Sequence, residues 1–486
     1  MARCIALVLL TINLASAQDF TWTPGLQRAY SDLQKLKVQS AQQTLTREPL
    51  NGVRLFLEDY ADMMALVTSD DDRAFSRLSE REDERLNALK ELDTNSPWKR
   101  VLMAEVRLHW AFAKMKFGKE ISASWDVIRA YKLLAENQKL FPHFLPTYKS
   151  LGTLHIMIGS VPENYVWVAN LLGLHGNIQV GQQELQRVQE DPLFGLEAQL
   201  IDLLVRAYVL TFTDADGRSL QRLVDNNPDN LLLHFFGATI EQKNGHSQQA
   251  LMYLTARPTD SVYQPLPIVE NILGDIYIQK GQYPTAAAHF LKFLAVYKGQ
   301  NFVKDSYYKL FLCQWLANEP EAKSRPYLEK VVSVGRTTVE SDKNAQKFAE
   351  AYLKRGVSPN QKALMRARLA SDGGFTDSAL AYLRPYPESK FPLIAEKAEY
   401  NYRMGRIYQR RNEVDTAIPY LSRALTLSEA EQLSFGATAA LQLGYIYKQK
   451  NDRNKARSFF QKALSFKRHE YKNSVDNKAK AAISQL

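Results

Sequence analysis

Near the end of the chain, apolar and polar positions follow the period of an α-helix, in two stretches separated by a polar turn. In the first stretch a leucine, a glycine and a tyrosine stand at positions i, i+1 and i+4, so they share one helix face. In the second, two alanines flank a phenylalanine. The six positions are Leu443, Gly444, Tyr447, Ala456, Phe460 and Ala463. This pattern predicts two helices whose apolar stripes face each other, with Gly444 at their closest crossing.

The same order of large, small and aromatic residues recurs twice upstream. One copy comprises Met404, Gly405, Tyr408, Ala417, Leu421 and Ala424; the other comprises Leu273, Gly274, Tyr277, Ala286, Phe290 and Phe293. The clearest units span 267–300, 398–431 and 437–470, each with a polar turn between its two stretches. One helix pair cannot bury its apolar face alone, so the units must stack.

This order, over about 34 residues, resembles the tetratricopeptide repeat. The resemblance implies an all-α fold, a right-handed superhelical solenoid of helix-turn-helix repeats in which the first helix of each pair lines a concave groove. The repeats become clear over 226–486, whereas 18–225 reads as divergent helical repeats.

A second resemblance covers roughly residues 100–190 and the repeats behind them. Val161-Pro162 and the turn from Gly173 to Asn177 are similar to a Leu-Pro break and a Gly-Phe-Ser-Gly-Asp turn in the inclusion-body-clearance type of tetratricopeptide protein. That resemblance implies a helical interaction protein without catalytic residues.

Residues 1–17 have the pattern of a secretory signal peptide. Arg3 precedes an apolar run, and Ala15-Ser16-Ala17 is a small-residue cleavage site, which leaves Gln18 as the mature N-terminus. We therefore expect export, to the periplasm or the cell envelope. No other segment is apolar enough to span a bilayer. Removal of the signal leaves Cys313 as the single cysteine, within an apolar helical run, so no internal disulfide is expected.

The sequence contains no pattern that points to catalysis, a cofactor or a metal. The eight histidines are scattered, and none forms the paired arrangement of a zinc protease. Three aspartates at 70–72 lack the spacing of a calcium loop and instead indicate the acidic start of a helix. Neither a phosphate-binding loop nor a nucleophile elbow is present.

The chain is basic, with a formal net charge of +10 and a pI near 9.2, and much of the excess lies in the last repeat. A polar outer face that closes the solenoid explains part of this charge. Nucleic acid would suit the charge but not export. A protein or peptide partner is expected, and the basic excess favours an acidic one.

Transferring the geometry of tetratricopeptide repeats gives a candidate peptide-binding groove. Its predicted inward residues are Asn271, Asp275, Tyr402, Arg406, Arg410, Tyr445 and Lys448. Tyrosines supply contact area and arginines bind carboxylates in a bidentate manner.

The sequence thus favours an exported, non-enzymatic scaffold that binds a protein or peptide at the cell envelope. Two alternatives stay open. One is a glycan-binding accessory protein of the outer membrane, against which the absence of a lipid-attachment cysteine counts. The other is an enzyme with an unrecognised site around Tyr165, Trp167 and His175.

Overall fold

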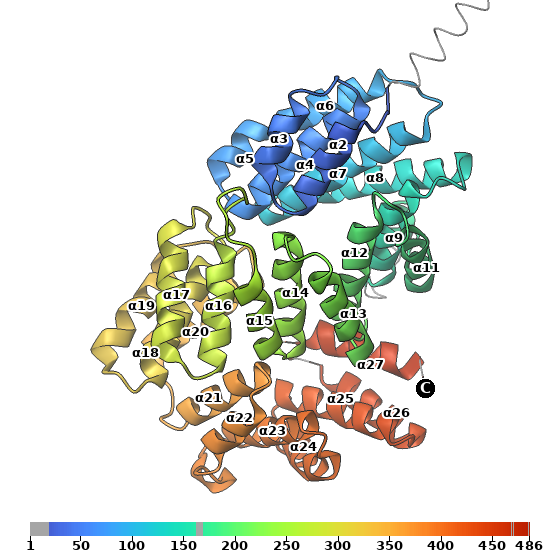
Figure 1. Cartoon of the computed structure of the whole chain (residues 1–486). Coiled ribbons are helices and arrows are strands. Elements are labelled where there is room, and N and C mark those ends of the chain that lie inside the picture. The colour runs from blue at the N-terminus through green and yellow to red at the C-terminus, as the bar shows by residue number, and fades with distance from the viewer. Residues whose placement is uncertain (1–18, 162–168, 468, 470, 485) are drawn as a thin grey trace, which may run out of the picture.

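The computed structural model describes residues 19–161, 169–467, 469, 471–484 and 486, so the predicted signal peptide lies outside the described part. Those residues form helices and no strands, which confirms the all-α prediction. Figure 1 shows the helices stacked as an array that curls back on itself.

The first group of helices forms a bundle whose core also includes Tyr148, Phe194 and Leu231 from the part of the chain that follows. It comprises α2 (Pro24–Gln34), α3 (Val38–Leu45), α4 (Gly52–Ser69), α5 (Asp72–Leu78), α6 (Arg81–Lys90), α7 (Pro97–Lys116) and α8 (Glu120–Leu140). The acidic helix start expected at 70–72 is confirmed, because the Asp71 carboxylate caps α5 by accepting the amide of Arg73 at 2.8 Å. Asp70, in the left-handed conformation, ends α4.

The array continues with helices that stack pairwise below and beside this bundle. They are α9 (Pro146–Gly159), α11 (Ile178–Val188), α12 (Gly195–Tyr208), α13 (Asp214–Asp225), α14 (Leu231–Asn244), α15 (Ser247–Ala256), α16 (Ile268–Gln279), α17 (Tyr283–Val296), α18 (Val303–Leu316), α19 (Glu321–Ser333) and α20 (Glu340–Arg355).

The last group forms the lower part of the array. It comprises α21 (Gln361–Asp372), α22 (Thr376–Leu383), the short η1 (Glu388–Lys390), α23 (Ile394–Arg410), α24 (Val414–Ser428), α25 (Ser434–Gln449), α26 (Arg453–Ser465) and α27 (Lys472–Ser484). Helix α27 packs on α25 and α26 and buries Val475, Ala479 and Ala482, so it covers the apolar face that the last repeat would otherwise expose.

The same turn joins the two helices in seven of the pairs from α7 to α26. In each, one residue has a positive φ, and the next amide donates to the carbonyl five residues before it, as in a Schellman motif. The positive-φ residues are Gly118, Gly245, Gly281, Asn318, Gly374, Asn412 and Asn451. Glycine and asparagine tolerate this conformation best. The shared turn fixes the helix pair as the unit of the array.

The close helix crossing predicted at Gly444 is confirmed. A Cβ atom on Gly444 would lie 2.4 Å from Cε1 of Phe460, so the phenylalanine ring occupies the space that glycine leaves. Gly274 stands in the same relation to Phe290, and Gly405 to Leu421, at 2.6 Å each. Small residues therefore let the first helix approach the large side chain of the second in all three clear repeats.

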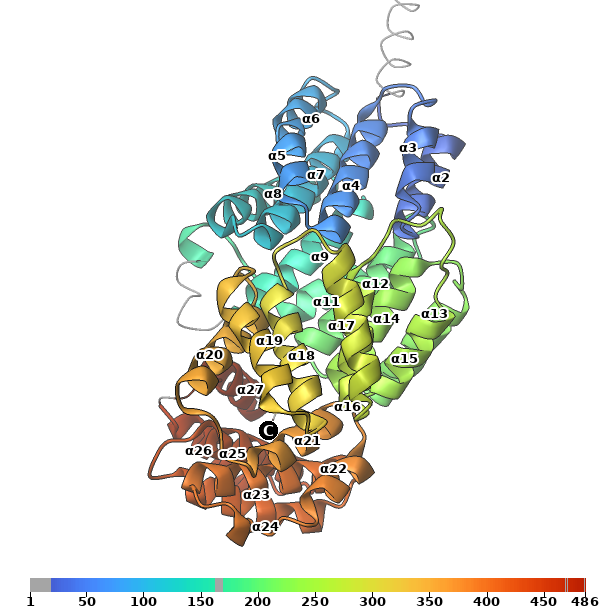
Figure 2. The same cartoon turned by 90° about the vertical axis from the view of Figure 1, so that its left-hand side faces the viewer.

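The array curls until two distant turns touch. The amide of Ser247, after the α14–α15 turn, donates to the carbonyl oxygen of Gly373, in the α21–α22 turn, at 3.1 Å. A Cβ atom on Gly374 would lie 2.1 Å from the carbonyl oxygen of Gly245, so the two backbones are in direct contact. Figures 1 and 2 show the resulting curl, in which α21 returns to pack on α16.

The N-terminal bundle docks on the middle of the array through its loops. The Asp70 carboxylate accepts hydrogen bonds from the hydroxyl of Tyr297 and, at 3.1 Å, from Nδ2 of Asn301. Arg336 forms a bidentate ion pair with Asp72, with N···O distances of 3.0 and 2.8 Å. These contacts hold α4 and α5 against α17, α18 and the loop after α19.

Candidate binding groove

The curl of the array forms an open cavity of about 610 Å³. It is lined by Tyr208, Phe235, Thr239, Gln242, Lys243, Ile268, Asn271, Ile272, Asp275, Gln279, Phe302, Asp305, Lys309, Ser341, Asp372 and Arg410. These residues come from α12, α14, α16, α18, α20, α21 and α23, except for Phe302, which directly precedes α18. Apart from the start of α20, they belong to the first helices of the pairs, as expected for the concave face. We call this surface the inner groove.

Three of the seven predicted groove residues, Asn271, Asp275 and Arg410, line this cavity together. Asn271 is buried, and its Nδ2 donates to Oγ of Ser306 at 2.8 Å. It therefore ties α16 to α18, and its amide is partly used by the fold itself.

Asp275 belongs to a compact charged group on the wall of the groove. Nζ of Lys309 lies 2.6 Å from a carboxylate oxygen of Asp275 and 2.5 Å from one of Asp305. Burial raises the pKa of Asp275 to about 6, with a further contribution from the charge of Asp305. Burial opposes the charge of Lys309, but the two carboxylates outweigh it and raise the pKa of Lys309. Lys309 is thus the single cation shared by two carboxylates, and the raised pKa means that Asp275 takes up a proton at a higher pH than an ordinary aspartate does.

Arg406 and Arg410 lie one turn apart on α23. The Arg410 guanidinium donates to the carbonyl oxygens of Ser371 and Asp372, the latter at 3.4 Å. Burial lowers the pKa of Arg410, and the charge of Arg406 lowers it further. Arg406 donates to Oε1 of Gln409 and of Gln442, at 2.5 and 2.7 Å. Both arginines are therefore held by neutral oxygens.

The other predicted residues do not line this cavity. Tyr402 packs beside Phe435, with ring centroids 5.8 Å apart, and Tyr445 meets the Phe460 ring edge to face at 5.3 Å. Lys448 lies half-buried near the end of α25. Tyr445 thus serves the packing of α25 on α26.

Sequence reasoning missed Lys243, Asp305 and Lys309. The pair at 305 and 309 was detectable, because a 34-residue repeat places these positions in the register of Asn271 and Asp275. The apolar spacing of the α18–α19 pair departs from that of the clear repeats, so the inward register of Asp305 and Lys309 was not recognised. Lys243 lies near the end of α14, outside the three clear repeats from which the groove residues were predicted.

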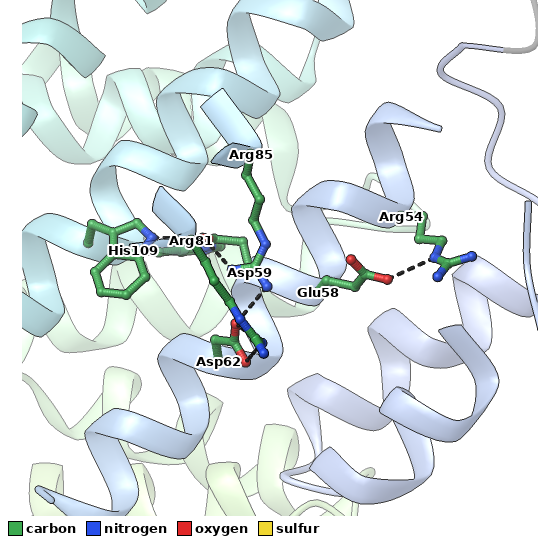
Figure 3. Close-up of polar contacts among 8 residues, drawn as sticks. Arg54, Glu58, Asp59, Asp62, Arg81, Arg85 and His109 are labelled. Carbon is green, nitrogen blue, oxygen red and sulfur yellow. Dashed lines mark hydrogen bonds and ion pairs between the residues drawn. The ribbon is translucent and has the colours of Figure 1, made fainter. Parts of the chain in front are cut away.

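A second polar cluster lies inside the N-terminal bundle (Figure 3). The Asp59 carboxylate contacts Nη1 of Arg85 at 3.1 Å, Nδ1 of His109 at 2.8 Å and Nε1 of Trp110 at 2.9 Å. Arg85 also reaches Asp62 at 2.6 Å. Asp59 is only 1% exposed, so a substrate cannot reach it without local unfolding. We assign this cluster to the packing of α4 on α6 and α7.

A third group of buried charges joins the bundle to the array. Nζ of Lys149 pairs with Glu105 at 3.0 Å and with Glu197 at 2.8 Å, and the hydroxyls of Tyr30 and Tyr60 donate to Glu197 at 2.6 and 3.1 Å. Lys149 lowers the pKa of Glu197 against the opposing effect of burial. The contacts connect α2, α4, α7, α9 and α12 and are satisfied within the protein.

Of the three residues named for the enzyme alternative, the structure describes only His175. Tyr165 and Trp167 lie outside the described residues, and His175 is exposed on a loop. Within the described part of the chain, no group of three or more histidine, cysteine, aspartate or glutamate side chains is placed to hold a metal ion. Cys313 is buried, and burial raises the pKa of its thiol to about 12, so it stays protonated.

A family model described as the tetratricopeptide repeat matches residues 396–469, which include α23 to α26. Residues 396–469 therefore carry tetratricopeptide repeats. No helix of the described residues combines the length and the apolar character needed to cross a membrane.

Comparison with known proteins adds only distant likenesses. No curated protein matches the chain. The human IFIT1 dimer with m7Gppp-AAAA is 13% identical, covers 92% of this chain and 96% of its own, and gives a TM-score of 0.35. The apo form of the quorum sensor NprR from B. thuringiensis is 11% identical, with coverage of 91% and 97% and a TM-score of 0.30. The APC/C hetero-tetramer Cut9-Hcn1 is 12% identical, with coverage of 98% and 98% and a TM-score of 0.25. At these values the ligands and partners of those proteins say nothing about this chain.

Proposed function

We propose that this protein is an exported, non-enzymatic scaffold of tetratricopeptide repeats that binds an extended segment of a protein partner in its inner groove. The observation that carries the proposal is the cavity of about 610 Å³ formed by the first helices of successive pairs. A cavity of this size accommodates a short extended stretch of chain, whereas a folded domain would not enter it.

The chemistry of the groove supports a peptide. Apolar and aromatic side chains such as Phe235 and Ile272 alternate along it with amides and with charges of both signs, including Gln242, Lys243 and Asp275. A peptide offers the same mixture of apolar side chains, backbone amides and charged groups. The second helices of the pairs leave the groove free of their side chains, so the repeat architecture itself provides the site.

Export is the second element of the proposal, and it rests on residues 1–17. A chain carrying this segment should yield a product that begins at Gln18 outside the cytoplasm, at the cell envelope. Sequencing the N-terminus of the fractionated protein tests this expectation. Recovery of the uncleaved chain from the cytoplasm alone would contradict it. The likeness of residues 100–190 to the inclusion-body-clearance type supports an interaction role but not the compartment.

A steric test of the groove separates it from the outer surface. Gln242 lines the cavity near the end of α14, and Gln242→Trp fills part of it without a change of charge. Met252, 55% exposed on α15, provides the matched control Met252→Trp. A partner recovered from envelope extracts by the mature chain should be lost with the first variant and retained with the second. Retention by both would exclude the inner groove as its binding site.

A further inference from the structure

Four cations lie in the inner groove or near it. Lys243 at the end of α14 and Arg410 at the end of α23 line the cavity, and Arg406 lies one turn before Arg410. The fourth is Lys478 on α27. Figure 1 shows α27 above α25 and below α13 and α14. We call these four residues the cationic cluster.

The charges in the cationic cluster act on one another. Burial lowers the pKa of Lys478, and the charges of Lys243 and Arg406 lower it further. The side chains of Lys243 and Lys478 are both exposed to solvent. Helix α27 therefore places the positive charge of Lys478 near those of Lys243 and Arg406.

The described residues provide little negative charge to balance the cluster. Arg406 and Arg410 donate to amide and backbone carbonyl oxygens, and in the described part of the chain no carboxylate forms an ion pair with any of the four cations. The acidic neighbour that acts on Arg410 is Asp372, which also faces Arg368 at 3.6 Å. Glu399 pairs with Arg403 at 2.9 Å, and Glu241 with His246 at 2.7 Å. The cluster thus retains a net positive charge.

The remainder of the cavity has a different character. Asp275 and Asp305 lie on α16 and α18, where Lys309 offsets only part of their charge. A ligand with negative charge along its whole length would be attracted at the cationic cluster and repelled at these carboxylates. A ligand with its negative charge confined to one end avoids that repulsion.

We propose that the cationic cluster binds the carboxylates of an acidic stretch at one end of a peptide, while the remainder of the peptide lies along the inner groove. The inference rests on the proposed function and deepens it by naming the chemistry of the partner. Arginines at 406 and 410 bind carboxylates in a bidentate manner, and the lysines add charge from the facing helices. Nucleic acid fits less well, because its phosphates continue past Asp275 and Asp305.

Fluorescence anisotropy with defined probes tests this proposal. The probe is a labelled ten-residue peptide with four glutamates at one end and neutral residues elsewhere; its companions replace the glutamates with glutamines or are single-stranded oligouridylates. The mature full-length chain is compared with Lys243→Gln/Lys478→Gln. The control is Arg457→Gln/Lys467→Gln, which removes two exposed charges on and just after α26.

The glutamate peptide should bind, and its Kd should rise about tenfold in the Lys243→Gln/Lys478→Gln variant but less than about twofold in the control. Added salt should weaken the binding. Equal losses in the two variants, or equal binding of the glutamine peptide, would overturn the assignment of the cluster. Tighter binding of the oligouridylate would overturn the choice of a peptide.

The Gln242→Trp variant separates the two proposals. If it abolishes capture of the envelope partner while Lys243→Gln/Lys478→Gln leaves that capture unchanged, the inner groove is the site and the cationic cluster is not its anchor. If Gln242→Trp leaves capture unchanged, the groove proposal itself is wrong.

Discussion

The amide of Ser247 donates a hydrogen bond to the carbonyl oxygen of Gly373 at 3.1 Å, and this single contact joins two turns far apart in the chain. Oγ of Ser247 also donates to Oε1 of Gln279 at 2.6 Å, which adds α16 to the junction. Three helix pairs meet there, beside the guanidinium of Arg410. The junction closes one side of the inner groove, so its integrity should control both stability and binding.

Gly374 provides a direct test of this junction. Its φ is +86°, and a Cβ atom would lie 2.1 Å from the carbonyl oxygen of Gly245. Gly374→Ala should cost the strain of the left-handed conformation, about 1–2 kcal/mol, and in addition push the two turns apart. Gly173→Ala is the matched control, because Gly173 has a φ of +74° and nothing within 4 Å. Urea denaturation should show a clearly larger loss for Gly374→Ala; equal losses would mean that the junction contributes no stability.

The crossing of α25 and α26 makes a second prediction. Gly444→Val should destabilise the protein by roughly 1–3 kcal/mol, because the added atoms collide with the Phe460 ring. Replacing that ring with a smaller side chain should relieve the collision. The cost of Gly444→Val measured in a Phe460→Leu background should therefore be smaller. Additive losses in the double variant would show that the two residues do not share the crossing.

The buried ion pairs of the N-terminal bundle predict a contrast between adjacent residues. Asp59→Ala leaves His109 and Trp110 without their acceptor and removes one of the two carboxylates that hold Arg85, so it should cost about 3–5 kcal/mol. Glu58→Ala removes a partly exposed pair with Arg54 and should cost less than about 1 kcal/mol. Thermal unfolding of both variants measures the contrast. A small loss for Asp59→Ala would exclude a structural role for the cluster.

The charged group at Asp275 predicts a pH dependence of stability. The carboxyl's pKa is about 6 in the folded protein, against an ordinary value of 3.8, so the folded state holds a proton that the unfolded state releases between these values. The stabilisation from this proton is present below about pH 4 and is lost as the pH rises through 6. Burial also raises the pKa of Asp342 to about 6. Wild type and Asp275→Asn both contain Asp342, so its contribution cancels in the difference between their free energies of unfolding.

The free energy of unfolding of wild-type protein, relative to Asp275→Asn, should therefore fall between about pH 4 and pH 6. Guanidinium denaturation at several pH values measures this difference. Parallel curves for the two proteins would mean that Asp275 titrates normally in the folded state.

Local features of the fold were predictable because nearby residues determine them. The spacing of Gly444 and Phe460 specifies a helix pair, and residues such as Gly281 and Asn451 specify the turn between two helices. The inward register of Asp275 follows from the same spacing, and adding one repeat length would have found Lys309.

The closure of the groove was not predictable in this way. Lys243 and Arg406 come near Lys478 only because the whole array curls, and that curl sums small rotations between successive pairs. Tyr445 shows the same limitation at shorter range. Its position in the repeat suggested an inward side chain, but the ring packs against Phe460. Contacts between distant repeats depend on packing that a single repeat does not encode.

Photo-cross-linking from inside the groove tests the central claim most directly. A benzoylphenylalanine at Thr239, which lines the cavity, is compared with one at Leu291, 49% exposed on α17. Under irradiation in cells, the Thr239 position should capture one defined segment of a partner, and Gln242→Trp should abolish that product. Capture of the same segment from Leu291, or an unchanged product with Gln242→Trp, would contradict binding in the inner groove.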